Sequence, residues 1–268
     1  MRAKWILEIA KQTLNEWSRE RVLWVSLVVG VVAVFGSILG ALLDPSHSVR
    51  LFSSWGYAAF RFSALGLGAV LGASVIAREA ERRTVQLLLS RGIGWDQIVF
   101  GKALGIGGLL FGSAVLLLGS LGSALVFWGG DPNSLLVVAQ GVTLGMGEAF
   151  LLASFSLFFA AWMKAPLALA SSLAVWLAGH QHGWVAHLRT RLTLESGGED
   201  LSGGVLSFFL KALQLLPRFD LLVVEHSVNH SIPVPIRDFL GPMAYALFLS
   251  VVLIFLSGGI LKMRGAPE

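Results

Sequence analysis

The stretch AREAERRTVQLLLSRGIGWDQIVFGK, residues 77–102, is the longest charged segment between two strongly apolar runs of this chain. It carries 5 of the 20 lysine and arginine residues, which makes it too polar to enter a bilayer. Three of its apolar residues recur at helical spacing and form a ridge: Val85, Leu88 and Leu89. We therefore expect an amphipathic segment at a membrane surface, between two membrane spans.

The composition around this stretch is that of a membrane protein. Hydrophobic residues make up 55% of the 268 residues and charged residues only 13%, whereas soluble domains carry roughly 25%. The mean hydropathy is +0.75. Because the charges gather in blocks between long apolar runs, the sequence predicts an all-α polytopic membrane protein.

Other features of the composition exclude several classes of protein. The pI near 9.8 does not indicate a nucleic-acid partner, because the basic residues flank the apolar runs instead of covering one face. The chain has no cysteine, which excludes disulfides and thiolate metal sites. About twenty polar-rich residues precede the first apolar run, so we expect no cleavable signal peptide.

Six apolar runs are long enough to cross a hydrocarbon core of about 30 Å, which needs about 20 helical residues. They cover residues 22–43, 57–77, 103–128, 135–161, 167–184 and 242–261. We expect them to form one transmembrane domain, residues 22–264. Residues 44–56 form a polar connection, and Arg61 lies close enough to the outer end of the second span to snorkel. Residues 185–241 form a long extracytoplasmic loop.

The amino-terminal residues 1–21 predict an amphipathic helix. Trp5, Ile9 and Trp17 fall on one half of the helical wheel. The other half carries Lys4, Glu8, Lys11, Glu16 and Arg19. Tryptophan on the apolar half is typical of a helix that lies in the membrane interface. The alternative is a solvated helix that packs on the protein's own loops.

The distribution of basic residues predicts the orientation. With the amino terminus in the cytoplasm, 13 lysine and arginine residues lie on the cytoplasmic side and 7 lie outside. This bias predicts that both termini are cytoplasmic. Segment 77–102 then also lies in the cytoplasm, and the expected location is a bacterial-type cytoplasmic (inner) membrane.

The chain carries no ATPase motif of its own. A Walker A loop needs G-x-x-x-x-G-K-[ST], and the nearest match, Gly101-Lys102-Ala103, lacks the hydroxyl that binds Mg²⁺. The HExxH and GxSxG motifs are absent too. We therefore expect no enzyme activity and no cofactor in this chain.

Residues 79–102 resemble the cytoplasmic signature of the permease subunits of type-2 ABC exporters, which runs roughly E-x-E-x-G-T-x-x-x-L-L-(S)-x-P-(h)-x-R-x-x-h-h-h-G-K. The matching residues are Glu79, Glu81, Thr84, Leu88, Leu89, Ser90, Ile98, Val99, Gly101 and Lys102. Arg83, Gly92 and Trp95 stand where glycine, proline and arginine are usual. The expected order of elements is similar across the whole chain. Within the family, the chain also resembles a group linked to multicopper-enzyme maturation.

The resemblance implies a permease that forms half of a translocation pathway. The other half would be a second copy of the chain, as a homodimer, or a paralogue, and two separate ATPase subunits would bind ATP and Mg²⁺. Residues 79–90 would be the cytoplasmic coupling helix. The residues implied in coupling to the ATPase are Glu79, Glu81, Arg82, Arg83, Thr84, Leu88, Leu89 and Arg91. The alternative function is a membrane anchor that passes ATPase-driven motion to an extracytoplasmic protein partner, and the alternative for this segment is a solvated loop held by lipid headgroups.

Two further features are candidate sites. Glu148 lies near the middle of the fourth span, where a charge costs roughly 2.5–3.5 kcal/mol on insertion scales. It either lines the translocation path or forms hydrogen bonds that fix helix packing. His226 and His230 are spaced i, i+4 beside Glu225, which is ligand spacing for zinc or copper if the segment is helical. They are candidate metal ligands, and ordinary surface histidines are the alternative.

Overall fold

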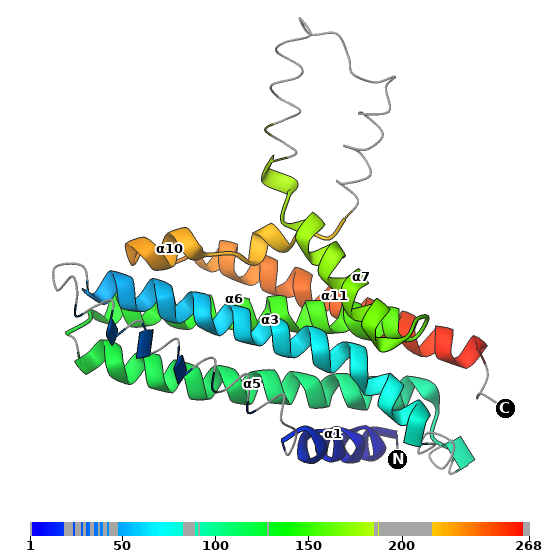
Figure 1. Ribbon diagram of the computed structural model, residues 1–268. Helices are drawn as coiled ribbons and strands as arrows, with labels where there is room; N and C mark the ends of the chain where they lie inside the picture. Colours follow the sequence, from blue (N-terminus) through cyan, green and yellow to red (C-terminus); the bar gives the residue numbers. More distant parts are fainter. Residues whose placement is uncertain are drawn as a thin grey trace, which may run out of the picture.

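The computed structural model describes residues 2–18, 48–82, 89–90, 92–127, 129–184, 187 and 216–264, together with isolated positions between residues 24 and 42. The described residues form helices and contain no strand. The elements are α1 (Arg2–Ser18), α3 (Ser48–Arg82), α5 (Trp95–Phe127), α6 (Pro132–Ala160), α7 (Ala165–Gly179), the 3-10 helix η3 (Phe219–Leu222), α10 (Glu225–His230) and α11 (Ile236–Met263). Figure 1 shows the four long helices α3, α5, α6 and α11 side by side.

Four helices among the described residues are long and apolar enough to cross a membrane. They are Ser48–Ala77, Trp95–Phe127, Pro132–Ala160 and Ile236–Met263. Each overlaps one of the expected spans, which confirms the all-helical class and is consistent with a membrane protein. The expected first span, residues 22–43, lies largely outside the described residues.

The expected fifth span, residues 167–184, is interrupted. Helix α7 has 15 residues and ends at Gly179, with His180 as its C-cap. At 1.5 Å per residue this is about 22 Å, which is shorter than the hydrocarbon core of about 30 Å. An apolar composition alone did not show where this helix stops.

The helix α3 is longer than expected at both ends. Residues 48–56 were expected in a polar connection, but α3 begins at Ser48. The hydroxyls of Ser53 and Ser54 bond to the carbonyl oxygen of Arg50 within the same helix, at 3.0 Å and 2.7 Å, so these polar residues fit inside a helix. The helix then continues beyond residue 77 to Arg82. Similarly, α11 begins at Ile236, and Pro242, which was expected to start the last span, lies inside it.

Helices α3 and α6 form the central pair of the bundle. A Cβ atom added to Gly68 would lie 2.5 Å from the carbonyl oxygen of Ala149, and one added to Gly72 would meet the carbonyl oxygen of Ala153. The two backbones are therefore in direct contact over one turn. This is the close approach that small residues four positions apart allow in membrane helices.

Helix α1 packs along the beginning of α5 (Figure 1). Cβ atoms added to Gly101 and Gly105 would lie 2.8 Å from Ile9 and 2.6 Å from Thr13. The matching spacing means that the two helices run in the same direction. Part of the apolar half that was expected to face lipid is thus covered by the protein, since Trp17 is 2% exposed. Placement of α1 in the membrane interface remains a prediction.

The short helices η3 and α10, which lie between α7 and α11, pack on the central pair: η3 contacts α6, and α10 contacts both α3 and α6. Val228 of α10 and Tyr57 of α3 both contact Gly141 of α6. Gln140 of α6 binds the backbone of Val234 twice, donating to its carbonyl at 3.0 Å and accepting from its N–H at 2.9 Å. The Gln140 amide thus provides the hydrogen-bond partners of the Val234 N–H and C=O groups, which lie outside any helix.

Candidate functional site

Glu148 lies in the middle of α6 and is the single charged residue of that helix. Its side chain is 0% exposed. A buried carboxylate is tolerated only when hydrogen bonds and an opposite charge replace the water that it lost. Its partners therefore decide what this residue does.

Arg61 of α3 is the counter-charge. Its Nε donates to Glu148 Oε2 at 2.7 Å, and its Nη2 donates to Oε1 at 2.9 Å. This two-point contact is the strongest geometry between a guanidinium and a carboxylate. The expectation that Arg61 snorkels at the outer end of the span is wrong, because α3 begins at Ser48 and Arg61 lies well inside it. Glu148 is consequently not an isolated charge.

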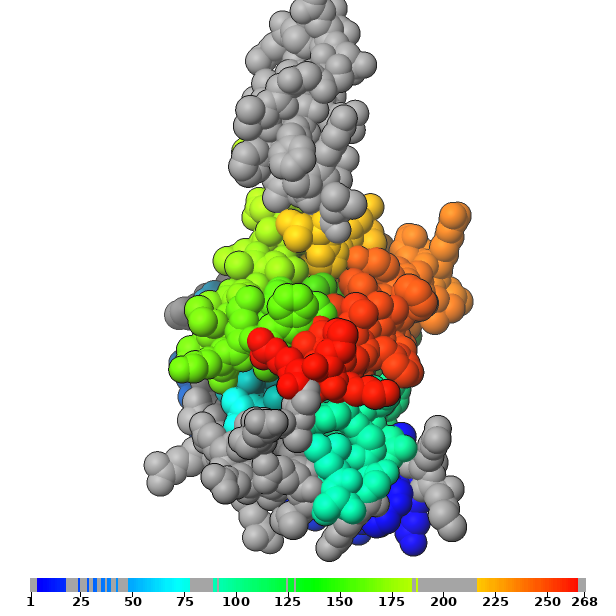
Figure 2. Space-filling view, turned by 90° about the vertical axis from the view of Figure 1, so that its right-hand side faces the viewer, coloured from blue at the N-terminus to red at the C-terminus, as the bar shows by residue number. Residues whose placement is uncertain are grey.

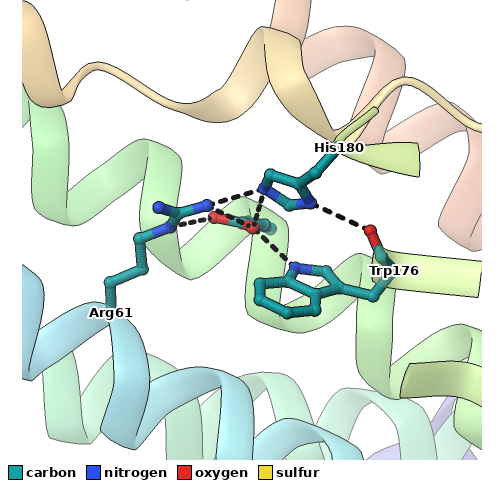
Figure 3. A network of polar contacts seen from close by, with 4 residues as sticks. Arg61, Trp176 and His180 are labelled. Atoms are coloured by element: carbon teal, nitrogen blue, oxygen red, sulfur yellow. Dashed lines mark hydrogen bonds and ion pairs between the residues drawn. The ribbon is translucent and has the colours of Figure 1, made fainter. Parts of the chain in front are cut away.

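Helix α7 completes the site with its last turn. The indole Nε1 of Trp176 donates to Glu148 Oε1 at 2.8 Å, and His180 Nε2 lies 3.3 Å from the same oxygen. Trp176 and His180 are one helical turn apart, so both side chains reach the same point (Figure 3). We refer to Arg61, Glu148, Trp176 and His180 as the carboxylate network.

The tautomer of His180 follows from its neighbours. Arginine has no acceptor atom, so His180 Nε2 must accept the hydrogen bond from Arg61 Nη2, which lies 2.7 Å away. The proton of the neutral ring then resides on Nδ1, which lies 2.9 Å from the carbonyl oxygen of Trp176 and donates to it. Arg61 Nη2 thus bridges the carboxylate and the imidazole (Figure 3).

The network joins three helices and an adjoining turn. Arg61 comes from α3, Glu148 from α6 and Trp176 from α7, and His180 is the C-cap of α7. The ring of Phe219 in η3 stacks on His180, with centroids 6.0 Å apart and an angle of 14° between the planes. The arginine also lies beside the carboxyl end of α7, where a positive charge is favourable. These contacts favour the packing interpretation of Glu148 over an open position on a translocation path.

The expected coupling residues fall on the far end of α3 and beyond it. Glu79, Glu81 and Arg82 lie in the helical backbone of α3, so residues 78–82 continue the second span instead of starting a separate helix. The side chains of these residues, and all of Arg83, Thr84, Leu88 and Arg91, lie outside the described residues. Leu89 is described and packs against a small cluster formed by Ile9, Ile93 and Ile98.

The two candidate metal ligands lie on one helix face, as predicted. Helix α10 places the rings of His226 and His230 with centroids 4.4 Å apart. Nδ1 of His230, an exposed residue, lies 3.0 Å from the carbonyl oxygen of His226. In the part of the chain that the structure describes, no third histidine, aspartate or glutamate joins them in a group that could hold a metal ion.

Sequence reasoning found Glu148 but missed its partners. Arg61 and Glu148 are opposite charges inside two of the apolar runs, the second and the fourth, and this signal could have paired them. The i, i+4 spacing of Trp176 and His180 was also readable. The end of α7 at Gly179, which brings both rings to Glu148, was not predicted. No protein-family model matches this chain, and no curated protein matches it.

Proposed function

We propose that this chain is the permease subunit of an ATP-driven type-2 ABC exporter in a bacterial-type inner membrane. It forms half of the translocation pathway together with a second copy or a paralogue, and separate ATPase subunits hydrolyse the ATP. Its termini and the segment 77–102 are cytoplasmic. The proposal rests on the sequence of residues 79–102 and on how the described part of this segment is packed.

The packing of residues 89–102 is the observation that carries the proposal. Ile93 and Ile98 are 2% exposed and pack with Ile9 of α1. Asp96 contacts Gly258 of α11, because a Cβ atom added to that glycine would lie 2.5 Å from its carboxylate. Figure 2 shows the start of α5 and the end of α11 together on this face. A push on this segment would therefore reach α1, α5 and α11 at once.

A small cavity marks the same end of the bundle. It is lined by Val75 and Ile76 of α3, Trp95, Ile98, Val99 and Lys102 of α5, Leu157 of α6 and Leu261 of α11. Lys102, the last residue of the family signature, is 5% exposed. The charged segment is thus joined to the ends of four long helices, as a coupling element must be if it moves the spans.

The test is charge reversal in the final turn of α3. The Glu79→Arg, Arg82→Glu double variant should reduce co-purification with the ATPase and ATP-dependent transport by about tenfold or more, since like charges would oppose docking. The matched control is Arg237→Glu, Asp238→Arg, a pair of exposed, neighbouring charges at the opposite end of the molecule. The control should assemble normally. Normal assembly and transport of the first variant would overturn the coupling role.

A second function is favoured by the enclosed carboxylate network. Because the network locks α3, α6 and α7 to one another, the chain could transmit ATPase-driven motion to an extracytoplasmic partner without moving a solute. ATPase activity stimulated by a solute in liposomes supports the exporter. Stimulation that depends only on a protein partner supports the anchor.

A further inference from the structure

We infer that His180 is a proton-binding site that controls how the end of α7 is held against α3. Protonation of Nε2 removes the acceptor that Arg61 uses, so acid detaches the end of α7 from α3; η3 moves with α7, which opens the junction between η3 and α6. This inference does not depend on the proposed function. It rests on the geometry of the carboxylate network.

The neutral form of His180 fits the observed contacts. Its Nε2 accepts from Arg61 Nη2 at 2.7 Å while its Nδ1 donates to the carbonyl oxygen of Trp176 at 2.9 Å. Arg61 and Glu148 then neutralise each other, and the buried cluster has no net charge. Histidine is the side chain whose charge normally changes between pH 5 and 8.

The protonated form does not fit these contacts. A proton on Nε2 would point a donor at Arg61 Nη2, itself a donor, across 2.7 Å. The same proton could bind Glu148 Oε1, now 3.3 Å away, but only if Arg61 gives up one of its two contacts with the carboxylate. The cluster would also carry an uncompensated positive charge in a buried position, which is costly. Release of Arg61 from His180 relieves both problems.

The end of α7 is placed so that it can respond. The side chain of His180 is 20% exposed, whereas that of Glu148 is 0% exposed, so the proton can reach the imidazole first. Gly179 packs against the carbonyl oxygen of Pro217 and the ring of Phe219. An aromatic ring accepts a histidinium at least as well as a neutral imidazole. Protonation therefore weakens the tie to α3 and keeps the tie to η3.

The other charged or titratable groups near this junction do not replace His180 in this role. On α3 they are Arg61 and, one turn before it, Tyr57; on α6 Glu148 is the only one. On η3, Asp220 accepts from Arg218 at 3.0 Å, and this hydrogen bond raises the pKa of the Arg218 guanidinium. Glu225 of α10 is exposed. His182 of the same chain segment bonds to the carbonyl oxygen of Leu216 at 3.0 Å and serves as a control.

The absence of cysteine makes a direct test available. Leu222 of η3 is 0% exposed, so a Leu222→Cys variant of the full chain reports opening of the junction. Its rate of labelling by a small water-soluble thiosulfonate is measured from pH 8 to pH 5.5, with and without His180→Gln. The ratio of the two rates cancels the intrinsic pH dependence of the thiol. His182→Gln and an Ala114→Cys reporter in α5 are the controls.

We divide the labelling rate measured with His180 present by the rate measured with His180→Gln. This ratio should rise by about fivefold between pH 8 and pH 5.5, which is the effect of losing one hydrogen bond. His182→Gln should leave this rise intact, and Ala114→Cys should show none. A ratio that stays constant from pH 8 to pH 5.5 overturns the inference, as does a rise that only His182→Gln removes. If His180→Gln does not fold, the labelling rate of Leu222→Cys is compared with that of Ala114→Cys. The same pH profile at both positions would also overturn the inference.

Discussion

Arg61 and Glu148 are two charged residues within apolar helices, and each is tolerated there because the other compensates its charge. The two residues are 87 positions apart in sequence, and their contact is made by two hydrogen bonds of 2.7 Å and 2.9 Å. In apolar surroundings the cost of removing charges from water can exceed the attraction between them, so such a pair specifies an arrangement more than it adds stability. The pair fixes the register of α3 against α6.

This view predicts how variants of the pair behave. Arg61→Met leaves the fully buried Glu148 without its counter-charge and should lower the free energy of unfolding by about 3–5 kcal/mol. Glu148→Leu should cost less, about 1–3 kcal/mol, because the Arg61 side chain is 16% exposed. The Glu148→Leu, Arg61→Met double variant should recover most of this loss, because no unpaired charge remains. The measurement is unfolding in mixed detergent micelles, analysed as a double-mutant cycle. Additive losses in the double variant would contradict a specific pair.

At the scale of an element, the contact between α1 and α5 shows what holds one helix against another. This contact depends on glycines, because Gly105 leaves no room for a side chain beside Thr13. Gly112 lies on the same helix with no atom within 4 Å of an added Cβ. Two Gly→Ala substitutions in one helix therefore test packing and helix propensity separately.

Gly105→Ala should loosen α1 because the added methyl group overlaps Thr13, at a cost of about 1–3 kcal/mol. Gly112→Ala should be neutral or stabilise the protein by up to about 1 kcal/mol, the difference in helix propensity between the two residues. Hydrogen–deuterium exchange of residues 2–18 distinguishes them. Equal exchange in the two variants would mean that α1 is not held by this contact.

The ends of helices show what sequence patterns could and could not predict. Four of the expected spans appear as helices because long apolar runs have few alternatives in a membrane. The start of α3 was missed because its serines looked like loop residues, although their hydroxyls bond to the helix itself. The end of α7 was missed because the apolar run was read as continuing to residue 184, although Gly179 is followed by the polar residues 180–182. In the structure Gly179 meets Pro217 and Phe219.

The site was also only partly predictable from the sequence. Glu148 was conspicuous because a single charge in an apolar helix needs a reason. Its three partners could not be predicted in the same way, because their contacts depend on where α3 begins, where α7 ends and how these helices pack against α6. In the coupling segment, the cluster of Ile9, Ile93 and Ile98 was not predicted, because it depends on how α1 packs against the start of α5. The side chains of most of the expected coupling residues lie outside the described part of the chain.

At the scale of the whole molecule, the arrangement of the bundle predicts which positions face the same side of the membrane. Trp162 follows α6 and Met263 ends α11, and both are exposed. Leu157 and Leu261 line one cavity together, so these two helices end at the same end of the bundle. Asn133, which is also exposed, lies at the beginning of α6 and therefore at the opposite end.

Single cysteines at these three positions turn this into a measurement, since the chain contains no other cysteine. In intact cells a membrane-impermeant maleimide should label Asn133→Cys. It should label Trp162→Cys and Met263→Cys only after permeabilisation, because the excess of basic residues predicts that their end of the bundle is cytoplasmic. If only Trp162→Cys and Met263→Cys are labelled in intact cells, the predicted orientation is wrong but the packing of the helices stands. Labelling of Trp162→Cys and Met263→Cys from different sides would contradict the packing of α6 against α11, and with it the path by which a cytoplasmic ATPase could move both helices together.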